Sequence, residues 1–313
     1  MPPAVLLLLI GAAILHAGWN ILLKTAEDTL RMAGRAMLVG AAVLIPAALV
    51  GWLVVGRPPI PTEAWTLAFV SGLLEALYFA LLSAAYARGD LSLVYPIARG
   101  TAPVLAVAIG IVFLGERLGP IAALGVALLL AGILALQRPW AILRRTSGMS
   151  PRTRQAAWLA VATGVSIAAY SAVDRSGARV VAPWLYAALI WGFAAVFLVG
   201  GIAVVDRRGR RGAGRALASA AAPGLGPVRP GATGWGRAAV GGLVTVAAYL
   251  LVLFALSTAP LSAVAPVRES AIVLVSGWGS FRLGEAATRR TALNRLAAAV
   301  VIVFGAILLA LGR

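Results

Sequence analysis

The chain has 313 residues, of which 61% are hydrophobic and 12% are charged. An ordinary soluble chain carries roughly 25% charged residues, so this composition excludes a water-soluble fold. The formal net charge of +17 does not indicate a nucleic-acid partner, because the arginines lie between long apolar runs and form no single stripe. Cysteine is absent and His16 is the only histidine, which excludes thiolate chemistry and a multi-histidine metal site. We therefore expect no metal and no other cofactor.

The apolar runs are long enough to cross a membrane, since roughly 20 helical residues span a hydrocarbon core of about 30 Å. The first run lacks a basic start and a cleavage site, which predicts a spanning helix and not a signal peptide. Pro260 and the segment 88–90 divide two longer apolar stretches. The ten predicted transmembrane helices are Pro2–Leu23, Ala36–Gly56, Ala64–Ala87, Leu91–Leu114, Leu118–Leu136, Ala156–Val173, Val180–Val205, Ala238–Ser257, Pro260–Phe281 and Leu296–Leu311.

The two halves of the chain repeat each other. The hexapeptide Leu91–Pro96 recurs as Leu261–Pro266, and the tripeptide Leu114–Glu116 recurs as Leu283–Glu285. Two directly joined halves with an odd number of spans cross the membrane in opposite senses. The sequence thus predicts an all-α integral membrane protein with ten transmembrane helices as two inverted five-helix repeats. The predicted boundaries are 1–137 for the first repeat, 138–155 for the linker and 156–313 for the second repeat.

Five short motifs resemble a known family. They are His16–Lys24, Tyr95–Gly100, Gly115–Leu118, Pro266–Ser270 and Gly284–Glu285. In order and spacing they resemble the EamA-type permeases of the drug/metabolite transporter superfamily, over nearly the whole chain. The resemblance implies a central cavity between the halves, alternating access and, in most members, export of metabolites, amino acids or drugs. It implies no particular substrate.

Four ionisable residues inside the predicted spans are the first site candidates, because a charge deep in lipid costs several kcal/mol unless it faces a cavity or a partner. Arg99 lies roughly 12 Å inside its helix, and Arg268 lies equally deep in the other half. Glu75 is near the middle of its span. Glu269 follows Arg268 about 100° further round the helix, so the two cannot face one direction equally. The alternative is that these residues form ion pairs that only hold helices together.

Polar and aromatic side chains surround these charges at helical spacing. His16, Trp19 and Asn20 share one face of the first helix, and Tyr78 shares a face with Glu75. The alternative for each is helix packing or an interhelical hydrogen bond. The further candidates for substrate binding are His16, Trp19, Asn20, Tyr78, Tyr95, Tyr170, Ser171 and Tyr249.

Two mechanistic hypotheses follow from the charges. Glu75 is a lone carboxylate at mid-depth, and we expect it to take up and release a proton. Burial and a nearby arginine change a carboxyl pKa in opposite directions, and the sequence leaves the outcome open. Arg99 and Arg268 each follow a proline, and a guanidinium grips a carboxylate or phosphate with two hydrogen bonds. We expect them to bind an acidic group of the substrate, or to exchange it for Glu75 or Glu269.

These patterns predict a secondary transporter in the bacterial inner membrane, exporting a small metabolite such as an amino acid or another anionic or zwitterionic solute. The predicted partners are that solute and membrane lipid, with no nucleic acid, and the chain is expected to act as a monomer or homodimer. An enzyme is not expected, because the sequence has no Gly-x-Ser-x-Gly motif, no cysteine and no second histidine. The alternatives are a flippase of a lipid-linked substrate and a non-transporting scaffold or sensor.

The loops predict an orientation that differs from the one the resemblance implies. Of the 27 lysines and arginines, 20 lie in loops on one side and five on the other, with two inside helices. Under the positive-inside rule this bias puts both termini outside, whereas the resemblance implies cytoplasmic termini. The segment Asp206–Arg237 contributes several of these charges and is predicted to be a disordered connector.

Overall fold

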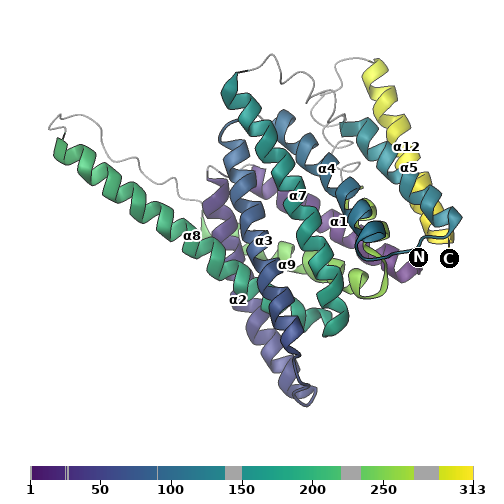
Figure 1. Ribbon diagram of the computed structural model, residues 1–313, viewed down its shortest axis with the longest axis horizontal. Helices are drawn as coiled ribbons and strands as arrows, with labels where there is room; N and C mark the ends of the chain where they lie inside the picture. Colours follow the sequence, from purple (N-terminus) through teal and green to yellow (C-terminus); the bar gives the residue numbers. More distant parts are fainter. Residues whose placement is uncertain are drawn as a thin grey trace.

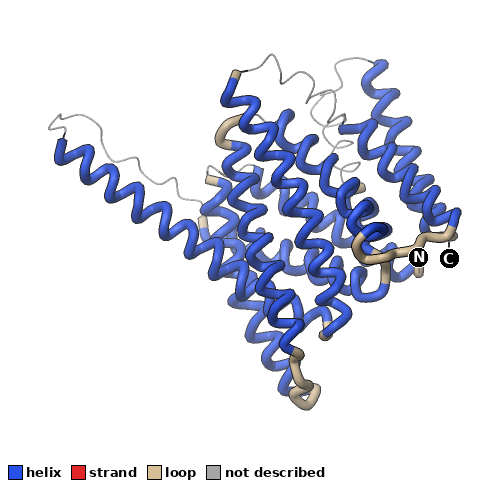
Figure 2. The backbone as a smooth tube through the Cα atoms, viewed as in Figure 1, coloured by secondary structure: helices blue, strands red, loops and turns tan. Residues whose placement is uncertain are grey.

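The computed structural model describes residues 2–24, 26, 28–89, 91–137, 150–219, 234–270 and 289–312. In this part of the chain the regular elements are all helices, as Figure 2 shows. They are α1 (Pro3–Lys24), α2 (Thr29–Val54), α3 (Thr62–Tyr86), α4 (Leu91–Val112), α5 (Pro120–Gln137), α7 (Pro151–Val180), α8 (Pro183–Ser219), α9 (Trp235–Thr258), α10 (Leu261–Glu269) and α12 (Arg289–Leu311).

The described helices have the length and apolarity of membrane spans. Seven of them, α2 to α5 and α7 to α9, contain a window that could cross a bilayer, and Pro3–Trp19 and Leu296–Leu311 are shorter apolar helices. Their outward faces carry large exposed apolar side chains, including Leu7, Val54, Phe113, Trp158, Val196 and Leu311. Such a surface suits lipid and not water. The chain is therefore an all-helical, multi-pass membrane protein.

Several of the predicted helix boundaries are wrong. α2 begins at Thr29 and not at Ala36, α7 begins at Pro151 and not at Ala156, and α12 begins at Arg289 and not at Leu296. The sixth predicted span stopped at Val173, but α7 continues to Val180. The seventh stopped at Val205, but α8 continues to Ser219 and extends beyond the bundle in Figure 1, so residues 206–219 are not a disordered connector. Both predictions stopped before a charged residue, although alanine and arginine are good helix formers. The ninth predicted span is described only up to Ser270, and its remainder lies outside the described residues.

Capping residues and prolines set several helix boundaries. The side chain of Asp28 accepts a hydrogen bond from the Arg31 N–H and begins α2, and Ser150 caps α7 in the same way. Pro260 has an extended backbone at the start of α10, which separates that helix from α9. The break predicted at Pro260 is thus present.

Packing joins helices from the two halves of the chain. α3 and α4 pack on α7, α1 packs on α9, α2 and α3 pack on α8, and α2 also packs on α9. α10 packs on α4, and α5 pairs with α12 at one edge of the bundle (Figure 1). Close backbone approach needs glycine at these contacts: a Cβ on Gly125 would lie 2.8 Å from the Gly305 carbonyl oxygen, and one on Gly242 would lie 2.4 Å from that of Ala36. The halves therefore share one interior.

Candidate substrate-binding pocket

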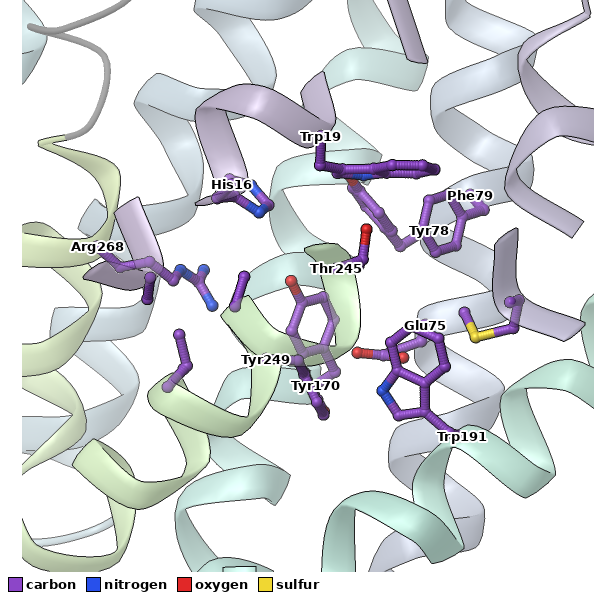
Figure 3. A pocket seen from close by; sticks show the side chains of 14 residues that line it. His16, Trp19, Glu75, Tyr78, Phe79, Tyr170, Trp191, Thr245, Tyr249 and Arg268 are labelled. Carbon is purple, nitrogen blue, oxygen red and sulfur yellow. The ribbon is translucent and has the colours of Figure 1, made fainter. Parts of the chain in front are cut away.

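A small pocket lies among α1, α2, α3, α7, α8, α9 and α10 (Figure 3). It receives side chains from both halves of the chain. Seven of the candidates named from the sequence line it: His16, Trp19, Glu75, Tyr78, Tyr170, Tyr249 and Arg268. Tyr95, Arg99, Ser171 and Glu269 are not among the lining residues. Contacts described below connect Ser171 and Glu269 to Arg268, Arg99 to Tyr78, and Tyr95 to Arg99. The side chain of Asn20 lies outside the described part of the chain.

The basic end of the pocket is a buried cluster of three charged side chains. Arg99 Nη1 lies 3.3 Å from both carboxylate oxygens of Glu269, and Arg268 Nε and Nη2 lie 3.2 and 3.1 Å from its Oε1. Arg268 also donates to the Ser171 hydroxyl over 3.3 Å. Arg268 lines the pocket and Glu269 does not, although the long guanidinium side chain of Arg268 reaches back across 100° of helix to Glu269. In this conformation both arginines are paired with Glu269.

Aromatic side chains connect Arg99 to the pocket. Arg99 Nη2 lies 3.5 Å from the Tyr78 hydroxyl, and its guanidinium lies 5.8 Å from the centre of the Tyr95 ring. Tyr78 in turn packs edge-on against Phe79 and Tyr170, with ring centres 4.7 and 6.1 Å apart. Tyr78 is thus the side chain that contacts both Arg99 and the pocket.

The acidic end of the pocket is formed by Glu75, and Tyr249, which also lines it, binds a second carboxyl group that was not among the candidates named from the sequence. Glu75 lines the pocket from α3. Asp174, 1% exposed, accepts hydrogen bonds from the Ser71 hydroxyl at 2.5 Å and the Tyr249 hydroxyl at 2.6 Å, and its charge acts on Glu75. The predicted end of the sixth span one residue earlier placed Asp174 outside the membrane. Its spacing of three residues from Ser171, one helical turn, was the signal that could have found it.

Aromatic rings form the walls between these two ends. Trp19 packs edge-on against Phe79 with ring centres 6.4 Å apart, and Trp191 packs against Tyr249 with centres 6.3 Å apart. Figure 3 shows Arg268 and Glu75 on opposite sides of the pocket, with the rings of Tyr170 and Tyr249 between them. Such an arrangement can bind a molecule that carries opposite charges at its two ends and an apolar group in the middle.

Glu116 is remote from the pocket and caps a helix. Its Oε1 accepts from the Leu261 N–H at 2.6 Å, and its Oε2 accepts from the Ser262 N–H at 2.8 Å, at the start of α10. Arg175 Nε lies 3.4 Å from Glu116 Oε1, and Arg175 Nη1 donates to the Leu256 carbonyl. These contacts give Glu116 an architectural role at the start of α10. Glu285 in the matching motif lies outside the described residues.

Comparison with known proteins gives a family match for the first part of the chain. No curated protein matches the chain. A crystal structure described only as that of a protein has a TM-score of 0.67 and 21% sequence identity, covering 99% of this chain and 98% of the other. A likeness at this identity shows a shared fold and nothing of function. Residues 3–137 match the model of the EamA-like transporter family, part of the drug/metabolite transporter superfamily.

Proposed function

We propose that the protein exports a small zwitterionic solute, such as an amino acid with an apolar side chain, across the bacterial inner membrane. One observation carries this proposal. The pocket has a guanidinium on one side, the Glu75 carboxyl group on the other and aromatic walls between them.

In the proposed complex each end of the zwitterion has its own partner. The carboxylate of the solute binds Arg268 and takes over part of its pairing with Glu269, which is 3.1 Å away in the present conformation. The ammonium binds Glu75, and the apolar side chain lies among Trp19, Tyr78 and Trp191. Because the pocket is small as it stands, loading a solute requires these side chains to separate.

The helix contacts support two inverted repeats and alternating access. Suppose that α1 to α5 correspond in order to α7, α8, α9, α10 and α12. Replacing each helix by its counterpart then turns each main helix–helix contact into another helix–helix contact that is present in the structure. The contact of α3 with α7 becomes α9 with α1, and that of α3 with α8 becomes α9 with α2. The contacts α2 with α8, α4 with α10 and α5 with α12 convert into themselves. Rocking of one half against the other then opens the pocket to alternate sides.

The test is transport by the purified full-length chain in liposomes. Counterflow of radiolabelled amino acids is measured for the wild type, Arg268→Lys, Arg268→Gln and the control Arg57→Gln, in which an exposed arginine is replaced. Lysine keeps the charge and loses the two-pronged hydrogen bonding, so we expect partial loss with lysine and near-complete loss with glutamine. Full transport by a folded Arg268→Gln protein would remove the arginine from the mechanism. Absence of counterflow for every amino acid, with movement of labelled lipid, would favour the flippase alternative.

A further inference from the structure

We propose that Glu75 and Asp174 form a single proton-binding pair bridged by the Tyr249 hydroxyl, and that the amino group of the solute displaces this proton. The pair involves a residue that the sequence analysis did not identify. Its exchange with a solute rests on the proposed function, whereas the pair itself can be tested without any solute.

Hydrogen-bond counting indicates one proton for the two carboxyl groups. Asp174 receives a hydrogen bond on each oxygen, from Ser71 and from Tyr249, as an ionised carboxylate does. The single phenolic proton of Tyr249 is thereby committed to Asp174. Glu75 lines the same pocket as Tyr249. Because the phenolic proton is committed to Asp174, a Glu75 that meets the Tyr249 oxygen must itself carry the proton and donate it.

Two buried donors beside the pair are a second, independent sign of a site. Within the described part of the chain, the Tyr186 hydroxyl and the Trp191 indole N–H have no hydrogen-bond partner, and their residues are 0% and 2% exposed. Tyr186 packs against Gly177, which lies one helical turn after Asp174. Its hydroxyl interacts electrostatically with the carboxyl groups of Asp174 and Glu75. Trp191 lines the pocket near Glu75 (Figure 3). These donors can serve a second carboxylate once the proton has left, and an indole N–H cannot ligate a metal ion.

The charges around the pair also favour one proton. Arg99 and Arg268 together with Glu269 leave one positive charge, and a carboxyl pair holding one proton supplies one negative charge. The buried set is then neutral, which avoids an uncompensated charge in a low-dielectric interior. The other titratable side chains that act on Glu75 or Asp174 or line the pocket with them are His16, Tyr78, Tyr170, Tyr186 and Tyr249.

The exchange step is a proton transfer to water. The ammonium of the entering solute forms an ion pair with Glu75, the O–H bond of Glu75 breaks, and the proton passes to water on the side open at that moment. Departure of the solute on the other side lets Glu75 take a proton from water there. One proton therefore moves against each zwitterion.

The pair is tested by infrared spectroscopy of the purified full-length chain in detergent, with no solute present. We expect the wild type to show the C=O stretch of a buried protonated carboxyl group, which disappears as the pH is raised. Glu75→Gln and Asp174→Asn should both remove this signal at neutral pH. In each variant one carboxyl group remains, and without a second negative charge beside it that group ionises and loses the shared proton. The control Glu63→Gln, at an exposed glutamate of α3, should keep it. A wild type without the signal, or a signal that Asp174→Asn leaves unchanged, would overturn the pair.

Two further measurements keep the proposal open to refutation. If Asp174→Asn does not fold, Ser71→Ala and Tyr249→Phe are used instead, because each removes one hydrogen-bond donor to Asp174. Both variants should shift the pH at which the infrared signal disappears. An unchanged titration in both would overturn the pair. In liposomes with the membrane potential clamped, one proton per zwitterion predicts that one pH unit drives about tenfold accumulation of L-leucine or L-phenylalanine. Counterflow of these probes without pH-driven accumulation would refute the proton exchange but not the proposed transport function. The infrared signal without any counterflow would refute the transport function but not the proton-binding pair.

Discussion

Glu116 offers a prediction whose magnitude can be worked from the structure. Its carboxylate accepts the N–H groups of Leu261 and Ser262 at 2.6 and 2.8 Å, and its side chain is 7% exposed. α10 has no capping side chain of its own, since Pro260 occupies its N-cap position. Hydrogen bonds to a charged group are each worth about 1.5–3 kcal/mol, and a lost cap costs about 0.5–2 kcal/mol. Because water can partly replace the carboxylate, we expect Glu116→Ala to lower the free energy of unfolding by about 2–4 kcal/mol.

The assay is denaturant or thermal unfolding of the purified protein in detergent, followed by tryptophan fluorescence. Glu116→Gln keeps an acceptor oxygen and loses the charge, so its loss should be intermediate. Gly110→Ala should resemble Glu116→Ala, because its new Cβ would lie 2.4 Å from Glu116 Oε2 and displace the carboxylate. Glu63→Ala, at an exposed position, is the control. Equal stability of Glu116→Ala and Glu63→Ala would refute the reasoning.

Three further predictions concern packing, ion pairing and orientation. Gly242→Ala should cost about 1–3 kcal/mol because its Cβ meets the Ala36 carbonyl oxygen, whereas Gly201→Ala, with no atom within 4 Å, should be neutral by the same unfolding assay. Arg99→Gln should cost about 1.5–3 kcal/mol because it removes one of the two guanidinium groups that pair with Glu269, and an unchanged melting temperature would contradict that. Reporter fusions at Arg313 and after Arg211 should place the C terminus outside and Arg211 in the cytoplasm, as the loop charges predict, and the reverse result would favour the orientation that the resemblance implies.

Local patterns predicted the helices and much of the pocket. Long apolar runs identified the spans, and Pro260 identified the break between α9 and α10. Helical spacing grouped Glu75 with Tyr78, and both line the pocket. These inferences succeeded because apolar length, proline geometry and helical periodicity act over a few residues.

Contacts between distant segments could not be read from the sequence. Glu116 caps a helix that begins 145 residues later, and no local pattern indicates such a partner. Asp174 was missed because a charged residue was taken as the end of a span, although hydroxyl groups from α3 and α9 satisfy its carboxylate inside the bundle. The pairing of Arg99 with Glu269 likewise depends on how α4 and α10 pack, which becomes apparent only from the fold.

The most direct test of the central claim is a binding measurement with matched ligands. Isothermal titration calorimetry measures the binding of L-phenylalanine, of 2-phenylethylamine, which lacks the carboxylate, and of 3-phenylpropionate, which lacks the ammonium. The same comparison is made for L-leucine with its corresponding amine and acid. The account predicts that at least one of the two amino acids binds, that loss of either charged group weakens its binding by about tenfold or more, and that Arg268→Gln abolishes the discrimination against the amine. Binding of the amine and the acid as tightly as the amino acid, or binding of neither amino acid, would contradict it.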